Sequence, residues 1–262
     1  MYLAFVRSAF QTEFAYRGQL WAAIFGQLVQ VFARIAIWMS VMASGAAVSG
    51  VGLGDMVTYA ILAGTVLAAW DPSSMLYAVT KSLKDGDISA QLLRPVNYPL
   101  SLFATELGKL AYRAIGVVVP VVVIAVLVYG IRPPASVFHG AMFPLFWFLS
   151  FLLLFEFAAI GGMLAFWFMT AFTIDWLLWA ILALVSGQFI PLWFFPEWLA
   201  NTVRYLPFSW IGFYPAAVYL GKVSIAEALV LLGVGAGWVV LLALGVAALW
   251  RRATLRITVQ GG

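Results

Sequence analysis

The chain has 262 residues, of which 65% are hydrophobic and 9% are charged. A soluble domain of this size needs a charged surface that this composition cannot supply. The net charge of +4 is too small to argue for nucleic acid as a partner. The lack of cysteine excludes thiol chemistry and disulfides, and the single histidine leaves no ordinary Cys/His metal site.

Long apolar runs predict an all-α, polytopic membrane protein. A helix needs about 20 apolar residues to cross a hydrocarbon core of about 30 Å. We expect six membrane spans, at residues 19–43, 55–78, 101–130, 138–170, 174–192 and 224–250. Ahead of them, residues 1–17 include apolar side chains at helical spacing, which favours an amphipathic helix on the membrane surface. We treat residues 1–262 as one domain.

Six spans place both termini on the same side of the membrane. Most Lys and Arg residues near the span ends fall on that side, whereas Arg132, Arg204 and Lys222 fall on the other. By the positive-inside rule, both termini and the connection between the second and third spans are cytoplasmic.

Residues 188–222, between the fifth and sixth expected spans, are too apolar for an ordinary loop and are divided by prolines. We expect one or two half-helices that enter the outer leaflet without crossing it, one of them beginning at Glu197 after Pro196. Aromatic residues of this segment, including Trp210 and Phe213, fit a belt at the membrane interface.

Glycines in two expected spans predict close helix packing. The fourth span contains Gly161 and Gly162, which permit a kink or a close helix approach. The sixth contains Gly233 and Gly237 at GxxxG spacing. Contact with a substrate is the alternative interpretation of these glycines.

An ionisable residue within an expected span needs a partner, a watery surface or a function, and we single out Arg34, Asp71 and Glu156. Arg34 and Glu156 lie at similar depths, which predicts an ion pair between the first and fourth spans, with a role in the substrate path as the alternative. Asp71 precedes Pro72, so it either caps the helix that follows or faces an inner vestibule that attracts a cationic substrate.

Sequence motifs for catalysis are absent. The chain has no GxxxxGK[ST] loop to hold nucleotide phosphates, no GxSxG elbow and no HExxH helix. We therefore expect that it is not an enzyme, that it does not hydrolyse ATP itself, and that it holds no metal or cofactor.

The polar segment Lys81–Pro99 separates the second and third expected spans. Gly86 interrupts the chain, Asp87 can cap a short helix that runs to Arg94, and Pro95 ends it. Such a helix, held between two spans, has the form of a knob that docks into a partner's groove.

Two apolar residues, Ile88 and Leu92, lie on one face of this short helix. We expect them to be exposed beside the charged residues. The alternative is a polar connection that merely returns the chain to the membrane.

Two segments resemble the permease subunits of ABC-2-type exporters. The first is KDGDISAQLLRPV at residues 84–96, and the second is SGQFIPLWFFP at 186–196, followed by LPF at 206–208. The chain is most similar to permeases grouped with viologen and multidrug exporters, which carry no attached ATPase.

The resemblance implies a permease in a bacterial inner membrane that pairs with a second permease, identical or a sister chain. Two copies of a separate ABC ATPase would bind ATP and Mg²⁺. The residues that match the segment coupled to the ATPase are Asp85, Gly86, Asp87, Leu92, Leu93, Arg94 and Pro95. Those that match the outer gate are Gly187, Pro191, Pro196 and Pro207.

Aromatic-rich spans with Asp71 and Glu156 favour export of amphiphilic or cationic drug-like compounds. Export of lipid or of a lipid-linked glycan is the alternative within the same family. An ion-coupled secondary carrier is the alternative from a different class.

Overall fold

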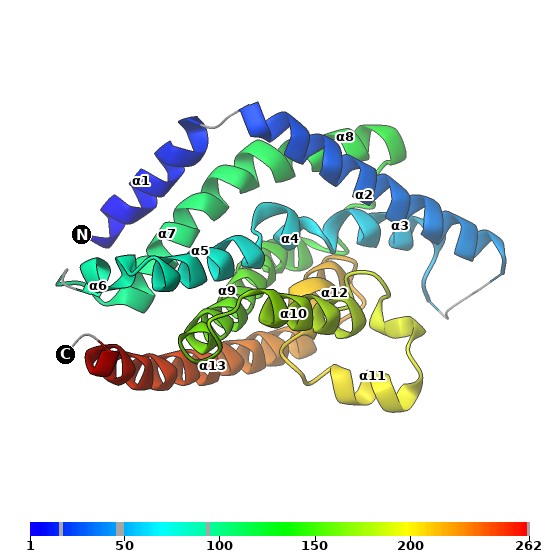
Figure 1. Cartoon of the computed structure of the whole chain (residues 1–262). Helices are drawn as coiled ribbons and strands as arrows, with labels where there is room; N and C mark the ends of the chain where they lie inside the picture. Colours follow the sequence, from blue (N-terminus) through cyan, green and yellow to red (C-terminus); the bar gives the residue numbers. More distant parts are fainter. Residues whose placement is uncertain (16–17, 46–49, 93–94, 261–262) are drawn as a thin grey trace.

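The structure, a computed structural model, describes residues 1–15, 18–45, 50–92 and 95–260. This part of the chain is helical and contains no strand, as predicted (Figure 1). The elements are α1 (Tyr2–Ala15), α2 (Gly18–Ala43), α3 (Leu53–Leu62), α4 (Thr65–Ala69), α5 (Pro72–Lys84), α6 (Asp87–Leu92), α7 (Tyr98–Arg113), a π-helical turn η1 (Ala114–Val118), α8 (Val119–Tyr129), α9 (Val137–Phe168), α10 (Phe172–Val185), a 3₁₀ turn η2 (Leu192–Phe194), α11 (Glu197–Val203), α12 (Ser209–Tyr219) and α13 (Ile225–Gln260).

Five helical segments of the described chain are long and apolar enough to cross a membrane. They are Gly18–Ala43, Leu53–Lys84, Tyr98–Tyr129, Val137–Phe168 and Ile225–Leu255. The expected fifth span is instead α10, an apolar helix of only 14 residues. It ends because the chain turns at Gly187, whose φ of +78° is a left-handed conformation that a helix cannot contain. Six full-length spans are therefore not confirmed.

The second span is interrupted twice and lies at the centre of the molecule. It breaks at Gly64, between α3 and α4, and at Asp71, between α4 and α5, where Pro72 occupies the first turn of the new helix. Every residue from Asp55 to Trp70 is buried. Other helices therefore surround this span on all sides along α3 and α4.

The N terminus, α6 and the C-terminal part of α13 lie at the same end of the molecule, which we call the α6 end (Figure 1). α9 and α13 run in the same direction toward it. At their starts, a ring nitrogen of His139 lies 3.1 Å from the carbonyl oxygen of Val223. Near their ends, the rings of Phe166 and Trp250 are 6.0 Å apart. Between α9 and α13, the chain must therefore return to the opposite end.

Residues 188–222 form short pieces, as the prolines predict. α11 begins at Glu197, which confirms the predicted helix start after Pro196. The expected aromatic belt is wrong for Trp210 and Phe213, which are 0% and 7% exposed. They are buried because α12 packs against α9 inside the protein, where Trp210 donates its Nε1–H to the Leu231 carbonyl at 3.1 Å.

The glycine that allows close packing on α13 is Gly235. A Cβ at Gly235 would lie 2.5 Å from Leu149 Cδ2 and from Trp210 Nε1, whereas one at Gly233 or Gly237 would meet nothing within 4 Å. Gly233 and Gly237 therefore do not pack closely against another helix of the described chain: GxxxG spacing identifies a helix face, but not the face that a neighbouring helix of this chain covers.

Candidate functional site

The predicted coupling segment forms a turn and a short helix at the α6 end (Figure 1). α5 ends at Lys84, Asp85 follows as its C-cap, and Gly86 takes a φ of +78°, which favours glycine. α6 then begins at Asp87, so the predicted interruption and helix start are confirmed.

The predicted coupling residues differ in their surroundings. Exposed positions are Asp85, Gly86, Asp87 and Pro95. Leu93 and Arg94 lie outside the described residues, and so does the side chain of Leu92. Their role in coupling stays a prediction.

Ile88 points into the protein, and the prediction that it is exposed is wrong. It is 4% exposed. It belongs to an apolar cluster with Val79, Tyr98, Met163, Phe166 and Ala253, which come from α5, α7, α9 and α13. The helical pattern identified an apolar face on α6, but the covering side chains come from distant parts of the chain. Ile88 therefore anchors α6 in an apolar cluster to which four other helices contribute.

Around this anchor lies an exposed surface with charges of both signs, which we call the α6 surface. Its charged residues are Lys81, Lys84, Asp85, Asp87, Arg251 and Arg252. α1 also reaches this region, because the Asn97 N–H donates to Tyr2 Oη at 3.2 Å. Mixed charges on a rigid base suit recognition of a protein partner with complementary charges.

Arg34 and Glu156 do not form the predicted ion pair. The described residues form three ion pairs, and neither Arg34 nor Glu156 takes part in any of them. The guanidinium of Arg34 lies against Gly64, where a Cβ would overlap it. Glu156 instead faces a cavity between α7, α9 and α13. Similar depth does not fix the direction of each side chain around its helix, which is why the prediction failed.

Asp71 caps α5, as one of the two interpretations predicts. The Ser73 N–H donates to Asp71 Oδ1 at 3.0 Å. Asp71 also lines a polar cavity of 260 Å³ together with Glu13, Lys109 and Arg113. Asp71 can therefore cap α5 and line the cavity at the same time. Attraction of a cationic substrate by Asp71 stays a prediction.

Glu106 is an intramembrane acid that sequence reasoning missed. It is 2% exposed, and its carboxylate accepts from Trp70 Nε1 at 2.8 Å and from Lys109 Nζ at 2.8 Å. The Glu106–Lys109 spacing of three residues could have revealed the ion pair on one helix face. The bond from Trp70 ties the second break of the central span to α7.

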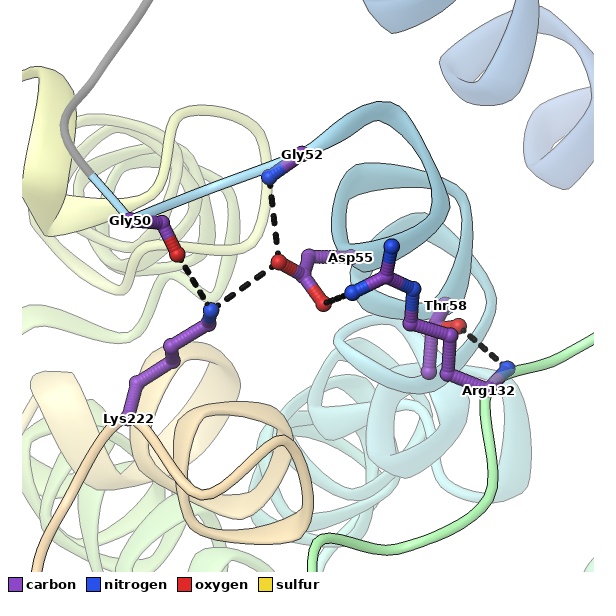
Figure 2. A network of polar contacts seen from close by, with 6 residues as sticks. All are labelled: Gly50, Gly52, Asp55, Thr58, Arg132 and Lys222. Carbon is purple, nitrogen blue, oxygen red and sulfur yellow. Dashed lines mark hydrogen bonds and ion pairs between the residues drawn. The ribbon is translucent and has the colours of Figure 1, made fainter.

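A polar network lies at the start of α3, at the end of the molecule opposite α6 (Figure 1), and Figure 2 shows its residues from close by. The side chain of Asp55 is 6% exposed. Its Oδ1 accepts from Arg132 Nη1 at 2.8 Å, and its Oδ2 accepts from Lys222 Nζ at 2.9 Å and from the Gly52 N–H at 3.0 Å. One carboxylate therefore pairs with two cations and also accepts from the backbone before α3.

Two further bonds complete this network (Figure 2). Lys222 Nζ donates to the carbonyl of Gly50, and the Arg132 N–H donates to Thr58 Oγ1 at 2.9 Å. The network thus joins the start of α3, the α8–α9 connection and the α12–α13 connection. Sequence reasoning missed it because Asp55 stood at the edge of an expected span and its partners are distant in the chain.

The predicted gate residues lie in the connections between α10 and α12. The carbonyl of Gly187 accepts from Tyr59 Oη at 2.6 Å, which ties the end of α10 to α3. Pro191 and Pro207 are buried, whereas Pro196 is exposed before α11. These contacts hold the segment against the central span, and its role as a gate stays a prediction.

α12 is also tied to α11 by Tyr214. The Tyr214 hydroxyl donates to the carbonyl of Arg204 at 2.8 Å. Burial raises the pKa of Tyr214 to about 12, so the phenol stays protonated and keeps this bond at neutral pH.

Comparison with known families gives a match over most of the chain. Residues 28–261 match the sequence profile of a family described as ABC-2 family transporter protein. The matched range begins within α2 and includes every later element. No curated protein and no solved structure shows a significant match to the chain.

Proposed function

The chain belongs to the ABC-2 transporter family, and we propose that it is the permease subunit of a bacterial ABC exporter, of the subgroup that includes viologen and multidrug exporters. Permeases of this family are the non-catalytic, multi-pass membrane component and act with an ABC ATPase. In our proposal, two ATPase copies bind ATP and Mg²⁺. A second permease, identical or a sister chain, completes the substrate path.

The observation that carries this proposal is the construction of the α6 surface. A six-residue helix has little stability of its own, yet α6 is held by Ile88 against four longer helices. Force applied by a partner at the exposed Asp85 or Asp87 would therefore reach the membrane helices directly. A flexible polar connection would absorb that force instead.

We propose that the chain crosses the inner membrane six times, with α10 and the turn after it as the short fifth crossing. The parallel directions of α9 and α13 support this topology, because the chain must return between them. The exposed basic residues of the α6 surface favour a cytoplasmic α6 end, and therefore cytoplasmic termini.

ATP-driven closure of the ATPases would push on α6 and move α5 and α7, between which it lies. The Asp55 network and the contact from Tyr59 to Gly187 fasten the opposite end of the same central span. We propose that the motion loosens these contacts and opens the path outward, with Gly187 and the prolines of residues 188–222 as the gate.

The proposed substrates are amphiphilic or cationic drug-like compounds. Carboxylates at Asp71 and Glu156 line two cavities, and the second cavity is largely apolar and aromatic. Export of lipid or of a lipid-linked glycan remains the alternative substrate class.

Transport in liposomes tests this function. We expect inside-out liposomes that contain the chain and its ATPase to accumulate a fluorescent amphiphilic cation when ATP is added. The controls are ADP and an ATPase variant that cannot hydrolyse ATP, and both should abolish accumulation. Uptake that persists without the ATPase and follows an ion gradient would instead identify a secondary carrier. ATP-dependent movement of lipid alone would select the alternative substrate class.

A further inference from the structure

A cavity of 480 Å³ lies between α7, α9 and α13, near the α6 end. Its lining includes the aromatic residues Phe103, Phe155 and Trp250 and the aliphatic Leu152. Leu100, also in the lining, is 52% exposed, so the cavity opens on the outside of the helix bundle. Its volume lies within the range of about 300–1,000 Å³ that is typical of small-molecule sites.

Glu156 gives this apolar cavity one charged group, which is half-buried. Its Oε2 atom is buried and has no hydrogen-bond partner among the residues that the structure describes. The carboxylate also forms no ion pair there, in contrast to Glu106 and Asp55. A buried carboxylate oxygen without a donor is unfavourable, so a cation that enters the cavity gains the interaction that the protein does not supply.

Arg251, at the edge of the cavity, is the other charged residue in the lining. It is exposed, so water and salt screen its charge. Glu156 is in less polar surroundings than Arg251, so its attraction for an opposite charge is stronger than that of Arg251. The cavity therefore favours a cationic group deep inside over an anionic group at its edge.

The aromatic walls suit the body of such a ligand. The rings of Phe103 and Phe155 meet edge to face, with centroids 5.1 Å apart. Trp250 is fixed by stacking on Tyr98 at 4.8 Å. Aromatic faces attract cations and pack against flat or aromatic groups.

We propose that this cavity is a binding site for amphiphilic cations, with the cationic group at the Glu156 carboxylate and the apolar body between Phe103, Phe155 and Trp250. The inference rests on the proposed export function, for which it names the site of substrate entry. The cavity opens beside the exposed Leu100 on the outside of the helix bundle, from which a membrane-dissolved cation can enter.

Equilibrium binding to the purified chain, without ATPase or ATP, tests this site. The probes are tetraphenylphosphonium and tetraphenylborate, which have nearly the same shape and opposite charge. We expect the wild-type chain to bind the phosphonium in preference to the borate, and Glu156→Gln to weaken phosphonium binding at least about tenfold. Glu197→Gln, at an exposed carboxylate on α11, is the matched control and should bind like the wild type.

A second variant separates loss of binding from loss of folding. Leu152→Trp fills the cavity without altering charge and should also abolish phosphonium binding, while circular dichroism checks that each variant keeps its helices. Unchanged phosphonium affinity in both variants, or equal binding of the borate, would overturn the proposed site. If the chain fails this binding test but still transports in an ATP-driven manner, the proposed binding site is wrong and the proposed export function is not contradicted.

Discussion

Replacing Asp55 with alanine is expected to lower the free energy of unfolding by about 3 kcal/mol, the lower end of the range for breaking a buried ion pair. The substitution leaves Arg132 and Lys222 without their carboxylate and the Gly52 N–H without its acceptor. Because the Arg132 side chain is 55% exposed and can turn to water, most of the loss comes from Lys222 and the backbone before α3.

The measurement for Asp55→Ala is thermal and denaturant unfolding of the purified chain in detergent. Glu197→Ala is the matched control, because it removes an exposed carboxylate that forms no ion pair among the described residues. A stability of Asp55→Ala equal to that of this control would show that the network in Figure 2 does not hold the molecule together.

Replacing Ile88 with alanine is expected to uncouple ATP hydrolysis from transport. Truncation of a buried isoleucine costs about 2–5 kcal/mol, and Ile88 is the one buried residue among the α6 side chains that the structure describes. The α6 surface keeps its charges, so the ATPase should still bind. The movement of the ATPase would no longer be transmitted efficiently through α6 to α5 and α7. We therefore expect the amount of substrate transported per ATP hydrolysed to fall about tenfold or more.

Ile88→Val is the conservative control, since it removes a single methylene and costs about 0.5–1.5 kcal/mol. It should retain most of the transport per ATP hydrolysed, measured in the same liposomes. Loss of ATPase binding in Ile88→Ala would show that the anchor is needed to hold α6 in the position that the partner recognises. Normal coupling in Ile88→Ala would show that the anchor does not transmit force.

The sequence predicted local features of the fold correctly where neighbouring residues determine them. Gly86 and Asp87 define a turn and a helix start, Asp71 caps the helix after Pro72, and Glu197 begins α11. Each depends on backbone conformation or on a hydrogen bond within a few residues. Composition and run length likewise predicted an all-helical membrane protein.

The predictions that failed depend on which faces of the helices pack against each other, and the order of residues along one helix does not determine this. Depth in the membrane suggested an Arg34–Glu156 pair, but the two side chains point to different neighbours. The apolar face of Ile88 is covered by four helices that are distant in the chain. The Asp55 network likewise joins connections that only the folded chain brings together.

Copurification of the chain with candidate ABC ATPases from the same genome tests most directly whether it is a permease driven through the α6 surface. We expect the wild-type chain to recover its ATPase, and the double variant Asp85→Arg, Asp87→Arg to lose it, because two exposed charges are reversed. Glu197→Arg, which reverses a charge on α11, should recover it normally. Failure of the wild-type chain to bind any ATPase, or full recovery by the double variant, would contradict the proposed coupling.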